Sequence, residues 1–265
     1  MVEPKYPGVV ESYVNIGDCY DKKALGDVRA EILSCMGGYP ACYQRAYRCL
    51  GAAEEIAEDV RSIVIAPQVE AKIAKRSKGI LSREIKKTGE GAGQVKQRFL
   101  SAVTHRGLLV EFDTVDKLFK RVYELADSYG LAHVMLTHLL SGAVAAGHDA
   151  VACVSPMAPD RLEHLLLPGL SLAFVTSSPA LPYEKRPYRR IRLDAMADAE
   201  AVRRNKARLR FSRKVSAALT EEAVDSLAQA KAMHDELEAL YNPYVDFDRV
   251  GRMADRIAGE ILKES

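Results

Sequence analysis

The residues best placed to do chemistry lie between positions 121 and 176, where a short strand, a tight connection and an apolar helix follow one another. The strand is predicted over residues 122–125 and the connection over residues 127–132. The helix is predicted over residues 133–146 and ends at Gly147. A strand that leads through a tight loop into a helix presents backbone amides that bind phosphate groups. The segment therefore has the layout of a phosphate-binding site.

The loop itself lacks the residues that would hold a phosphate. In the pattern G-x-x-x-x-G-K-[ST], backbone amides surround the phosphates, the lysine neutralises their charge and the hydroxyl holds Mg²⁺. Asp stands at the first glycine, Ala at the second, His at the lysine and Val at the Ser/Thr, so all four diagnostic positions differ. We interpret the segment as a degenerate phosphate loop, with the candidate site residues Asp127, Ser128, Tyr129, Gly130, Ala132, His133 and Val134.

These replacements predict weak or absent ATP binding. A neutral imidazole at His133 carries no fixed positive charge near pH 7, and the carboxylate of Asp127 would repel a phosphate. The predicted third strand ends at Thr176, where a nucleotide-hydrolysing domain usually offers an acid to the metal. We expect no cofactor and no metal site, and ATP with Mg²⁺ would bind only if the amides around Gly130 still surround a phosphate.

Composition indicates a globular protein without an attraction to membrane or nucleic acid. The chain has 265 residues, 48% of them hydrophobic, and a net charge of +2 from 38 basic and 36 acidic residues. The longest apolar stretch, residues 131–146, is too short to span a bilayer, and the N-terminus has no apolar signal region. Five cysteines without a CxxC pair argue against a disulfide framework. We therefore expect a cytoplasmic protein.

Two segments that lie 177 residues apart share one layout. Residues 13–21 and 190–198 each read as a short alternating strand, a turn and an aspartate at a helix start. The first strand, predicted over Tyr13 to Gly17, has no sheet of its own in the sequence before it. We expect it to pair with the same strand of another copy, or to stay poorly ordered until a partner domain arrives.

Long helical tracts follow both strands. Helices are predicted over residues 22–36, 41–65 and 69–86, and again over 199–218, 221–240 and 248–263. One helix carries a heptad seam that would face a partner helix, formed by Cys42, Ala46, Cys49, Ala53, Ile56, Val60 and Ile63. Both copies read as a strand that leads into a helical hairpin. The predicted domains are residues 1–93 with the first hairpin, 94–194 as an α/β domain, and 195–265 as the C-terminal hairpin.

Charge is uneven within the second hairpin. Residues 186–214 hold eleven basic and three acidic residues, whereas residues 215–265 hold five basic and eleven acidic ones. Antiparallel pairing of a basic helix with an acidic one would explain this, and a polyanion or RNA-binding surface is the alternative. A second basic cluster without a clear acidic partner consists of Lys72, Lys75, Arg76, Lys78, Arg83, Lys86 and Lys87.

Several motifs, taken in their order along the chain, resemble a prokaryotic family built from tandem P-loop ATPase-like domains, each followed by a helical hairpin. Lys5 to Asp18 resembles the segment that closes the first domain's sheet, and Arg45 to Ala53 resembles its hairpin. Phe99 to Thr104 resembles the start of the second domain. Three later segments, Pro159–Glu163, Leu166–Leu170 and Ala173–Ser178, resemble the second and third strands of that domain together with their connection.

The resemblance implies an α/β, P-loop NTPase-like three-layer fold with a parallel sheet and helical hairpins. It also implies that the chain begins near the end of the first domain and lacks that domain's nucleotide site. We therefore expect a non-catalytic P-loop ATPase-like module that acts as a scaffold for a protein partner, either an intact P-loop domain or a second copy. The alternatives are a residual ATP-binding or ATP-hydrolysing protein and a polyanion-binding helical module.

Overall fold

The computed structural model describes residues 6, 8–9, 11–89 and 91–264. They form two compact units, one made of residues up to 42 together with those from 229 onward, and one made of residues 43–228. This grouping differs from the predicted boundaries at 93 and 194. The reason is that two long helices, α3 (Tyr39–Val64) and α8 (Lys206–Tyr241), each contribute to both units.

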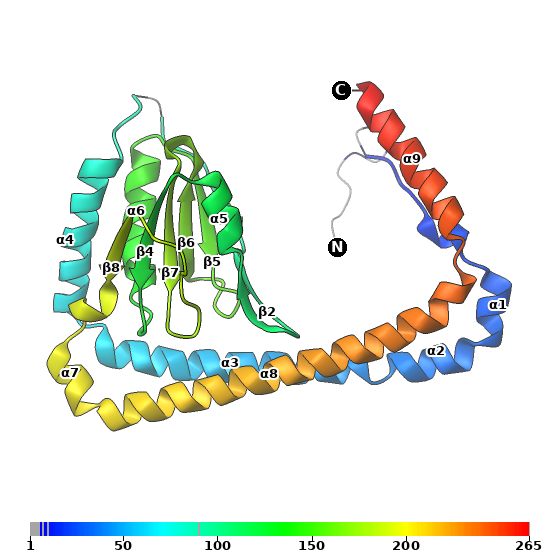
Figure 1. The fold of residues 1–265 in the computed structure, drawn as a ribbon, viewed down its shortest axis with the longest axis horizontal. Helices are drawn as coiled ribbons and strands as arrows, with labels where there is room; N and C mark the ends of the chain where they lie inside the picture. Colours follow the sequence, from blue (N-terminus) through cyan, green and yellow to red (C-terminus); the bar gives the residue numbers. More distant parts are fainter. Residues whose placement is uncertain (1–5, 7, 10, 90, 265) are drawn as a thin grey trace. The chain divides into compact units, whose positions relative to one another are not determined.

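A six-stranded sheet in the order β1-β5-β6-β7-β4-β8 forms the centre of the larger unit (Figure 1). Its strands are β1 (Val95–Arg98), β4 (Arg121–Ala126), β5 (Ala150–Val154), β6 (Leu162–Leu167), β7 (Leu172–Ser177) and β8 (Arg189–Arg192). A separate antiparallel hairpin joins β2 (Ser101–Thr104) to β3 (Gly107–Val110). The predicted α/β class is confirmed.

The sheet is mostly, but not entirely, parallel. Strand β6 runs antiparallel to both of its neighbours, β5 and β7, while the remaining pairs are parallel. The predicted all-parallel sheet is wrong at this strand. Only a short loop joins β5 to β6, and a 3₁₀ turn, η2 (Pro168–Leu170), joins β6 to β7. Parallel neighbours need a crossover of a dozen or more residues, so these short connections force the strand to reverse.

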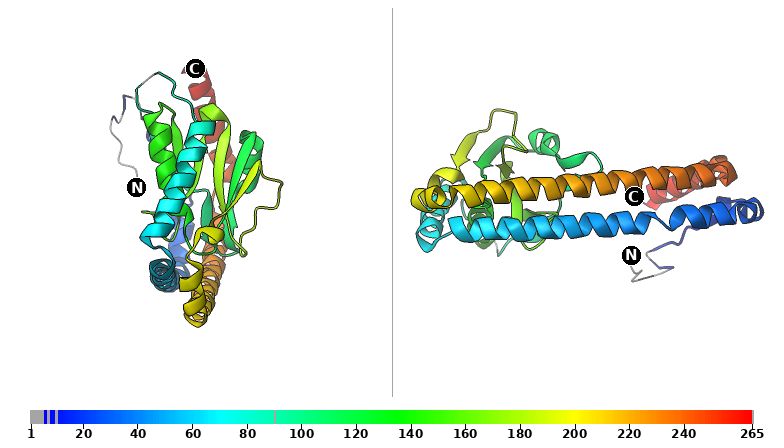
Figure 2. Two further views of the ribbon diagram at one scale, coloured as in Figure 1. Left: turned by 90° about the vertical axis from the view of Figure 1, so that its left-hand side faces the viewer. Right: turned by 90° about the horizontal axis from the view of Figure 1, so that it is seen from below.

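Helices cover both faces of the sheet. On one face lie α4 (Pro67–Glu84) and α6 (Ala132–Ala145), which pack with Tyr123, Leu125 and Phe174 of the strands in the main core. On the other face, α5 (Phe112–Leu118) packs through Val115 against Val122 and Val175. Because strand side chains alternate between faces, neighbouring residues of β4 enter different cores. The arrangement is compatible with a three-layer α/β fold (Figure 2).

Helices α3 and α8 run antiparallel within the larger unit (Figure 2). Arg208 binds the carboxylate of Asp59 through Nε and Nη2. Ser216 donates to the carbonyl of Ala53 at 3.4 Å, and Arg45 pairs with Glu222 at 2.8 Å. Along the predicted seam, Ala46, Ala53 and Val60 are buried. In this unit the seam of α3 therefore faces α8 of the same chain, which corrects the proposal that it holds a separate partner.

Helix α8 is continuous through residue 220, where two helices were predicted. Thr220 sits inside the helix, and its hydroxyl donates to the carbonyl of Ser216 without ending it. The C-terminal segment is therefore not a hairpin folded on itself. The expected pairing of a basic helix with an acidic one is also wrong. The end of the basic block and the start of the acidic block lie on the same helix, α8, and Arg208 of the basic block binds Asp59 of α3.

The smaller unit contains η1 (Ile16–Cys19), α1 (Lys22–Asp27), α2 (Arg29–Met36), the end of α8, η4 (Asn242–Tyr244) and α9 (Phe247–Glu264). Backbone hydrogen bonds join its two segments: Asp21 N donates to Tyr244 O at 2.8 Å and Asp246 N to Cys19 O at 2.9 Å. Arg249 donates to the carbonyl of Asp18 at 2.6 Å. The start of α9 is thus fixed to η1.

The repeat predicted from sequence extends to the element boundaries. Position 16 opens η1 and position 193 opens η3 (Leu193–Met196), and α1 (22–27) matches α7 (Ala199–Arg204). The next helix begins at 29 in one copy and 206 in the other, and the long helical tract ends at 64 and 241. An offset of 177 relates every pair. An 18-residue helix follows each copy, α4 (67–84) in one case and α9 (247–264) in the other, with an offset of 180 because the connection before α9 is three residues longer.

Capping geometry repeats as well. Asp21 accepts hydrogen bonds from the amides of Lys23 and Ala24, and Asp198 accepts them from Glu200 and Ala201. Both carboxylates satisfy amides in the first turn of a helix, as N-caps do. Val28 (φ −101°, ψ 12°) and Asn205 (φ −100°, ψ 14°) then break the helix in the same conformation.

The predicted strand over Tyr13 to Gly17 is not formed. Residues 12–15 have no assigned strand, and 3₁₀ helix η1 begins at Ile16. Tyr13 is 91% exposed. The offset relates residues 12–15 to β8, which is a strand only because β4 pairs with it. Among the described residues of the smaller unit there is no sheet to supply that pairing, so the local pattern alone does not produce a strand.

None of the helices in the described part of the chain combines the length and apolar composition that a membrane span needs.

Candidate functional site

The degenerate loop is built around the carboxylate of Asp127, which follows β4 directly. Its Oδ1 accepts a hydrogen bond from the amide of Tyr129 at 2.9 Å, and its Oδ2 accepts one from Ala132, the first residue of α6, at 2.6 Å. Asp127 is buried. Amides at a helix N-terminus are the groups that bind phosphate in an intact loop. Here the chain's own carboxylate occupies them.

Two further groups of the loop are also engaged. The amide of Ser128 donates to Asp194 Oδ1, in η3 directly after β8, at 2.8 Å. The carbonyl of Gly130 accepts from Arg161, on the connection between β5 and β6, at 3.0 Å. Gly130 has a φ of 78°, a conformation that favours glycine. Two separate segments therefore hold the loop in its present shape.

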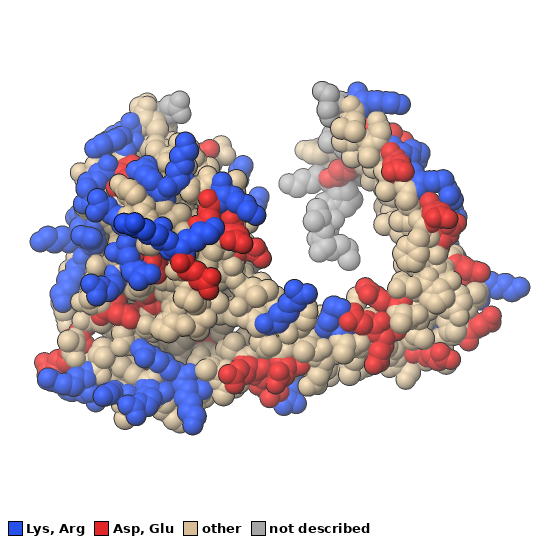
Figure 3. Space-filling model, in the orientation of Figure 1, with Lys and Arg blue, Asp and Glu red and all other residues tan. Residues whose placement is uncertain are grey.

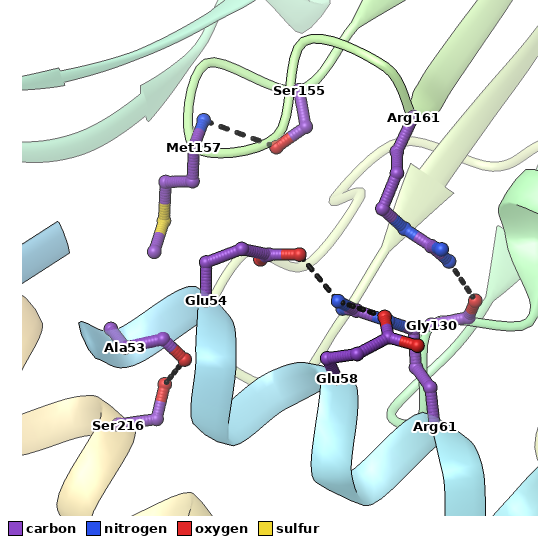
Figure 4. A network of polar contacts seen from close by, with 9 residues as sticks. All are labelled: Ala53, Glu54, Glu58, Arg61, Gly130, Ser155, Met157, Arg161 and Ser216. Atoms are coloured by element: carbon purple, nitrogen blue, oxygen red, sulfur yellow. Dashed lines mark hydrogen bonds and ion pairs between the residues drawn. The ribbon is translucent and has the colours of Figure 1, made fainter. Parts of the chain in front are cut away.

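Arg61 from α3 covers the loop from outside (Figure 4). A Cβ added to Gly130 would lie 2.9 Å from Arg61 Cδ, so the arginine packs directly on the glycine backbone. Arg61 is itself 8% exposed, and its guanidinium binds Glu54 and, at 2.7 Å, Glu58. With Arg161, these groups form a charged network over the loop in which two arginines and two glutamates balance.

His133, at the lysine position, has a structural role. Its Nδ1 accepts a hydrogen bond from the amide of Leu162 at 2.9 Å, at the start of β6. An acceptor nitrogen carries no proton, so this contact requires the neutral ring with its single proton on Nε2. Ala132 is buried in the main core and Val134 packs against it. The loop thus joins α6 to the sheet through residues that an intact phosphate loop would use for its ligand.

Burial shapes the protonation of these groups. Burial raises the pKa of Asp127 above its ordinary value, while the amide hydrogen bonds act in the opposite direction. Burial, followed by the charge of Arg161, lowers the pKa of His133, so the ring is neutral at pH 7. Burial and the nearby Arg61 lower the pKa of Arg161. The site combines a costly buried carboxylate with a neutral histidine, the reverse of the charge that a phosphate requires.

Thr176, at the position of the expected metal-binding acid, has both polar groups occupied. Its hydroxyl donates to the carbonyl of Glu163 at 2.5 Å, and its amide donates to His164 Nδ1 at 3.1 Å. These bonds tie β7 to the reversed strand β6. Within the described residues, the one group of potential metal ligands is the exposed cluster of His234, Asp235 and Glu238, far along the chain from the loop.

The structure brings all seven predicted site residues together, since they lie within the eight-residue segment 127–134. Sequence reasoning missed Arg61, Arg161 and Asp194, which approach the loop from α3, from the β5–β6 connection and from η3. No spacing in the sequence links these three positions, because each depends on how distant elements pack. The seam on α3 was the one usable signal, since Arg61 follows its buried Val60.

Neither family models nor curated proteins nor solved structures give a match to this chain. The tandem P-loop ATPase-like family therefore stays a prediction that rests on the motifs in the sequence.

Proposed function

We propose that this protein is a non-catalytic, P-loop ATPase-like module that acts as a scaffold and binds a partner α/β domain through its smaller unit. The observation that carries the proposal is the structural repeat. Its helical elements occur twice with an offset of 177 residues, whereas the described residues contain one six-stranded α/β sheet. One copy has an α/β body to hold, and the equivalent surfaces of the other are uncovered.

The first uncovered surface is α9. Its counterpart α4 lies against α6, where Val69, Ile73 and Ile80 are fully buried. The apolar residues of α9 recur at helical spacing but are less covered: Val250, Met253 and Ile257 are only partly buried, and Ile261 and Leu262 are 59% and 77% exposed. An amphipathic helix with an uncovered apolar face is typical of an interaction surface.

The second uncovered surface is the segment 12–15. Its counterpart β8 pairs in parallel with β4 at the edge of the sheet. The offset of 177 residues relates residues 12–15 to β8, and Tyr13 and Val14 carry exposed apolar side chains. Addition of a strand to a sheet edge is a common recognition mode. We therefore infer a partner with a parallel sheet edge and an apolar helix face, either a separate chain or part of the same polypeptide.

The non-catalytic part of the proposal is supported by the loop. The carboxylate of Asp127 already accepts the amide hydrogen bonds that a phosphate would need, and Thr176 offers the metal no charge. A bound ATP would have to displace the carboxylate from buried donors and leave it without its partners. Such a displacement costs roughly 1–3 kcal/mol for each donor or acceptor left unsatisfied.

Site-specific photocrosslinking in cells tests the partner. A photoreactive residue at Met253, on the apolar face of α9, is expected to capture a peptide from the helix of an α/β domain. The same residue at Asp255, which is exposed and points away from that face, is the matched control and should not. Crosslinks from position 253 that return only peptides of this chain's own α2 or α8 would contradict the proposal.

A further inference from the structure

A cavity of about 650 Å³ opens between the loop, η3, α7 and the start of α8. We call it the cationic pocket and define it by the side chains that line it with a positive charge or an aromatic ring: Tyr129, Arg203, Lys206, Arg210 and Arg213. All of them belong to the larger unit. The size is that of ordinary small-molecule sites.

The charge of this pocket is unbalanced. Four cations line it, and the only carboxylate in its lining is that of Asp194, which already accepts from Ser128 N. Neighbouring basic residues do have partners: Arg204 pairs with Glu200 and Arg208 with Asp59. In the described part of the chain none of the four pocket cations has a carboxylate within ion-pair distance. A cluster of like charges attracts an anion.

The positions of the cations make them converge. Lys206, Arg210 and Arg213 are spaced by four and three residues, so they share one face of α8. Arg213 lies with its guanidinium carbon 4.8 Å from the centroid of the Tyr129 ring, a cation–π contact that holds the arginine at the pocket wall. Figure 3 shows Lys and Arg side chains gathered over α7 and the first turns of α8.

The pocket lies where α/β proteins bind ligands. Tyr129 follows the carboxyl end of β4, and the segment 194–197 follows the carboxyl end of β8, which runs parallel to β4. Open α/β sheets bind ligands in crevices beyond the carboxyl ends of their strands. The carboxylate of Asp127 closes the loop on the α6 side, but it leaves this neighbouring crevice open.

We propose that the cationic pocket binds a small phosphorylated ligand, with its phosphate oxygens on Arg203, Lys206, Arg210 and Arg213. Guanidinium groups bind phosphate through paired charge-assisted hydrogen bonds. The four cations line one cavity of small-molecule size, which favours a small anion over RNA. This site is separate from the amides of the degenerate loop and does not depend on the partner-binding proposal.

Calorimetric titration of pyrophosphate at low ionic strength tests the proposal. The double variant R203E/R210E reverses two pocket charges, and R204E/K214E reverses two nearby charges outside the pocket. We expect pyrophosphate to bind the native protein and to lose at least about tenfold in affinity with the first variant, but no more than about twofold with the second. Circular dichroism checks that each variant is folded. If R203E/R210E does not fold, R203Q/R210Q takes its place.

The source of the phosphate group is identified in the same titrations. Tighter binding of ADP than of pyrophosphate, lost in Tyr129→Leu, assigns a nucleotide that contacts the ring, and equal binding assigns a phosphorylated metabolite. Three results overturn the proposal: no binding of pyrophosphate up to about 10 mM, equal losses in both double variants, or binding of a single-stranded RNA that both variants weaken equally.

Discussion

The carboxylate of Asp127 and the amide of Ala132 are 2.6 Å apart, joined by a hydrogen bond across the turn that connects β4 to α6. In a phosphate-binding loop, that amide would point at the ligand. The aspartate thus performs in the folded chain what a phosphate performs in a nucleotide complex. We propose that the stability of the loop and a loss of phosphate binding have a common origin in this contact.

Replacement of Asp127 by alanine tests its structural role. The change leaves the amides of Tyr129 and Ala132 without their acceptor in a buried turn. We expect a loss of about 1–2 kcal/mol in the free energy of unfolding, measured by denaturant titration. Ser128→Ala is the control, since only the backbone amide of Ser128 takes part in the loop. Equal stability of D127A and the native protein would contradict this role.

His133 predicts a specific dependence of stability on pH. Its pKa in the folded protein lies below the ordinary value of 6.5, so the unfolded chain binds more protons as the pH falls. The stability that the neutral ring contributes is present above pH 6.5 and is lost as the pH falls through the folded-state pKa. Unfolding titrations across this window should show the loss in the native protein and its absence in His133→Asn. Parallel curves for the two proteins would rule out the role assigned to the ring.

The packing of α3 on α8 predicts a large effect at Ala53. This residue is fully buried, and its carbonyl accepts a hydrogen bond from Ser216. Ala53→Asp places a charge in that interface without a cationic partner, and we expect a loss of about 3 kcal/mol or more. Glu55→Gln, on the exposed face of the same helix, should change stability by less than about 0.5 kcal/mol. A mild effect at Ala53 would mean that the helices do not pair as described.

The two copies of the repeat predict unequal effects at equivalent positions. Ile80 of α4 is fully buried, whereas Ile257 of α9, 177 residues further along the chain, is only partly buried. Ile80→Asp should destabilise the protein by about 3 kcal/mol or more, and Ile257→Asp by about 1 kcal/mol or less. In the crosslinking experiment Ile257→Asp should nevertheless abolish capture of the partner. Equal destabilisation by the two changes would place α9 against a buried core and remove the surface on which the scaffold proposal depends.

Elements that depend on contacts between residues close in the sequence were predicted correctly from local patterns. The strand, loop and helix from Arg121 to Gly147 were predictable from apolar periodicity and the glycine that ends the helix. The repeat was visible because Asp21 and Asp198 cap helices by the same local hydrogen bonds. Such contacts lie within a few residues and leave a trace in the sequence.

Features that depend on distant contacts were missed. The helix break predicted near Thr220 does not occur, because α8 packs along α3. The approach of Arg61 to Gly130 likewise depends on how α3 packs on the α/β body. The sequence predicted that the carboxylate of Asp127 would repel a phosphate. Only the structure shows that it accepts hydrogen bonds from the amides of the loop.

Binding of Mg²⁺–ATP is the measurement that tests the central claim most directly. Calorimetric titration into the R203E/R210E variant examines the degenerate loop alone, because the positive charge of the cationic pocket is then cancelled. The account predicts no saturable binding at concentrations up to a few millimolar, since Asp127 accepts hydrogen bonds from the loop amides and His133 and Val134 stand at the lysine and Ser/Thr positions. A dissociation constant in the micromolar range, lost in a further His133→Ala change, would contradict it and show a working nucleotide site.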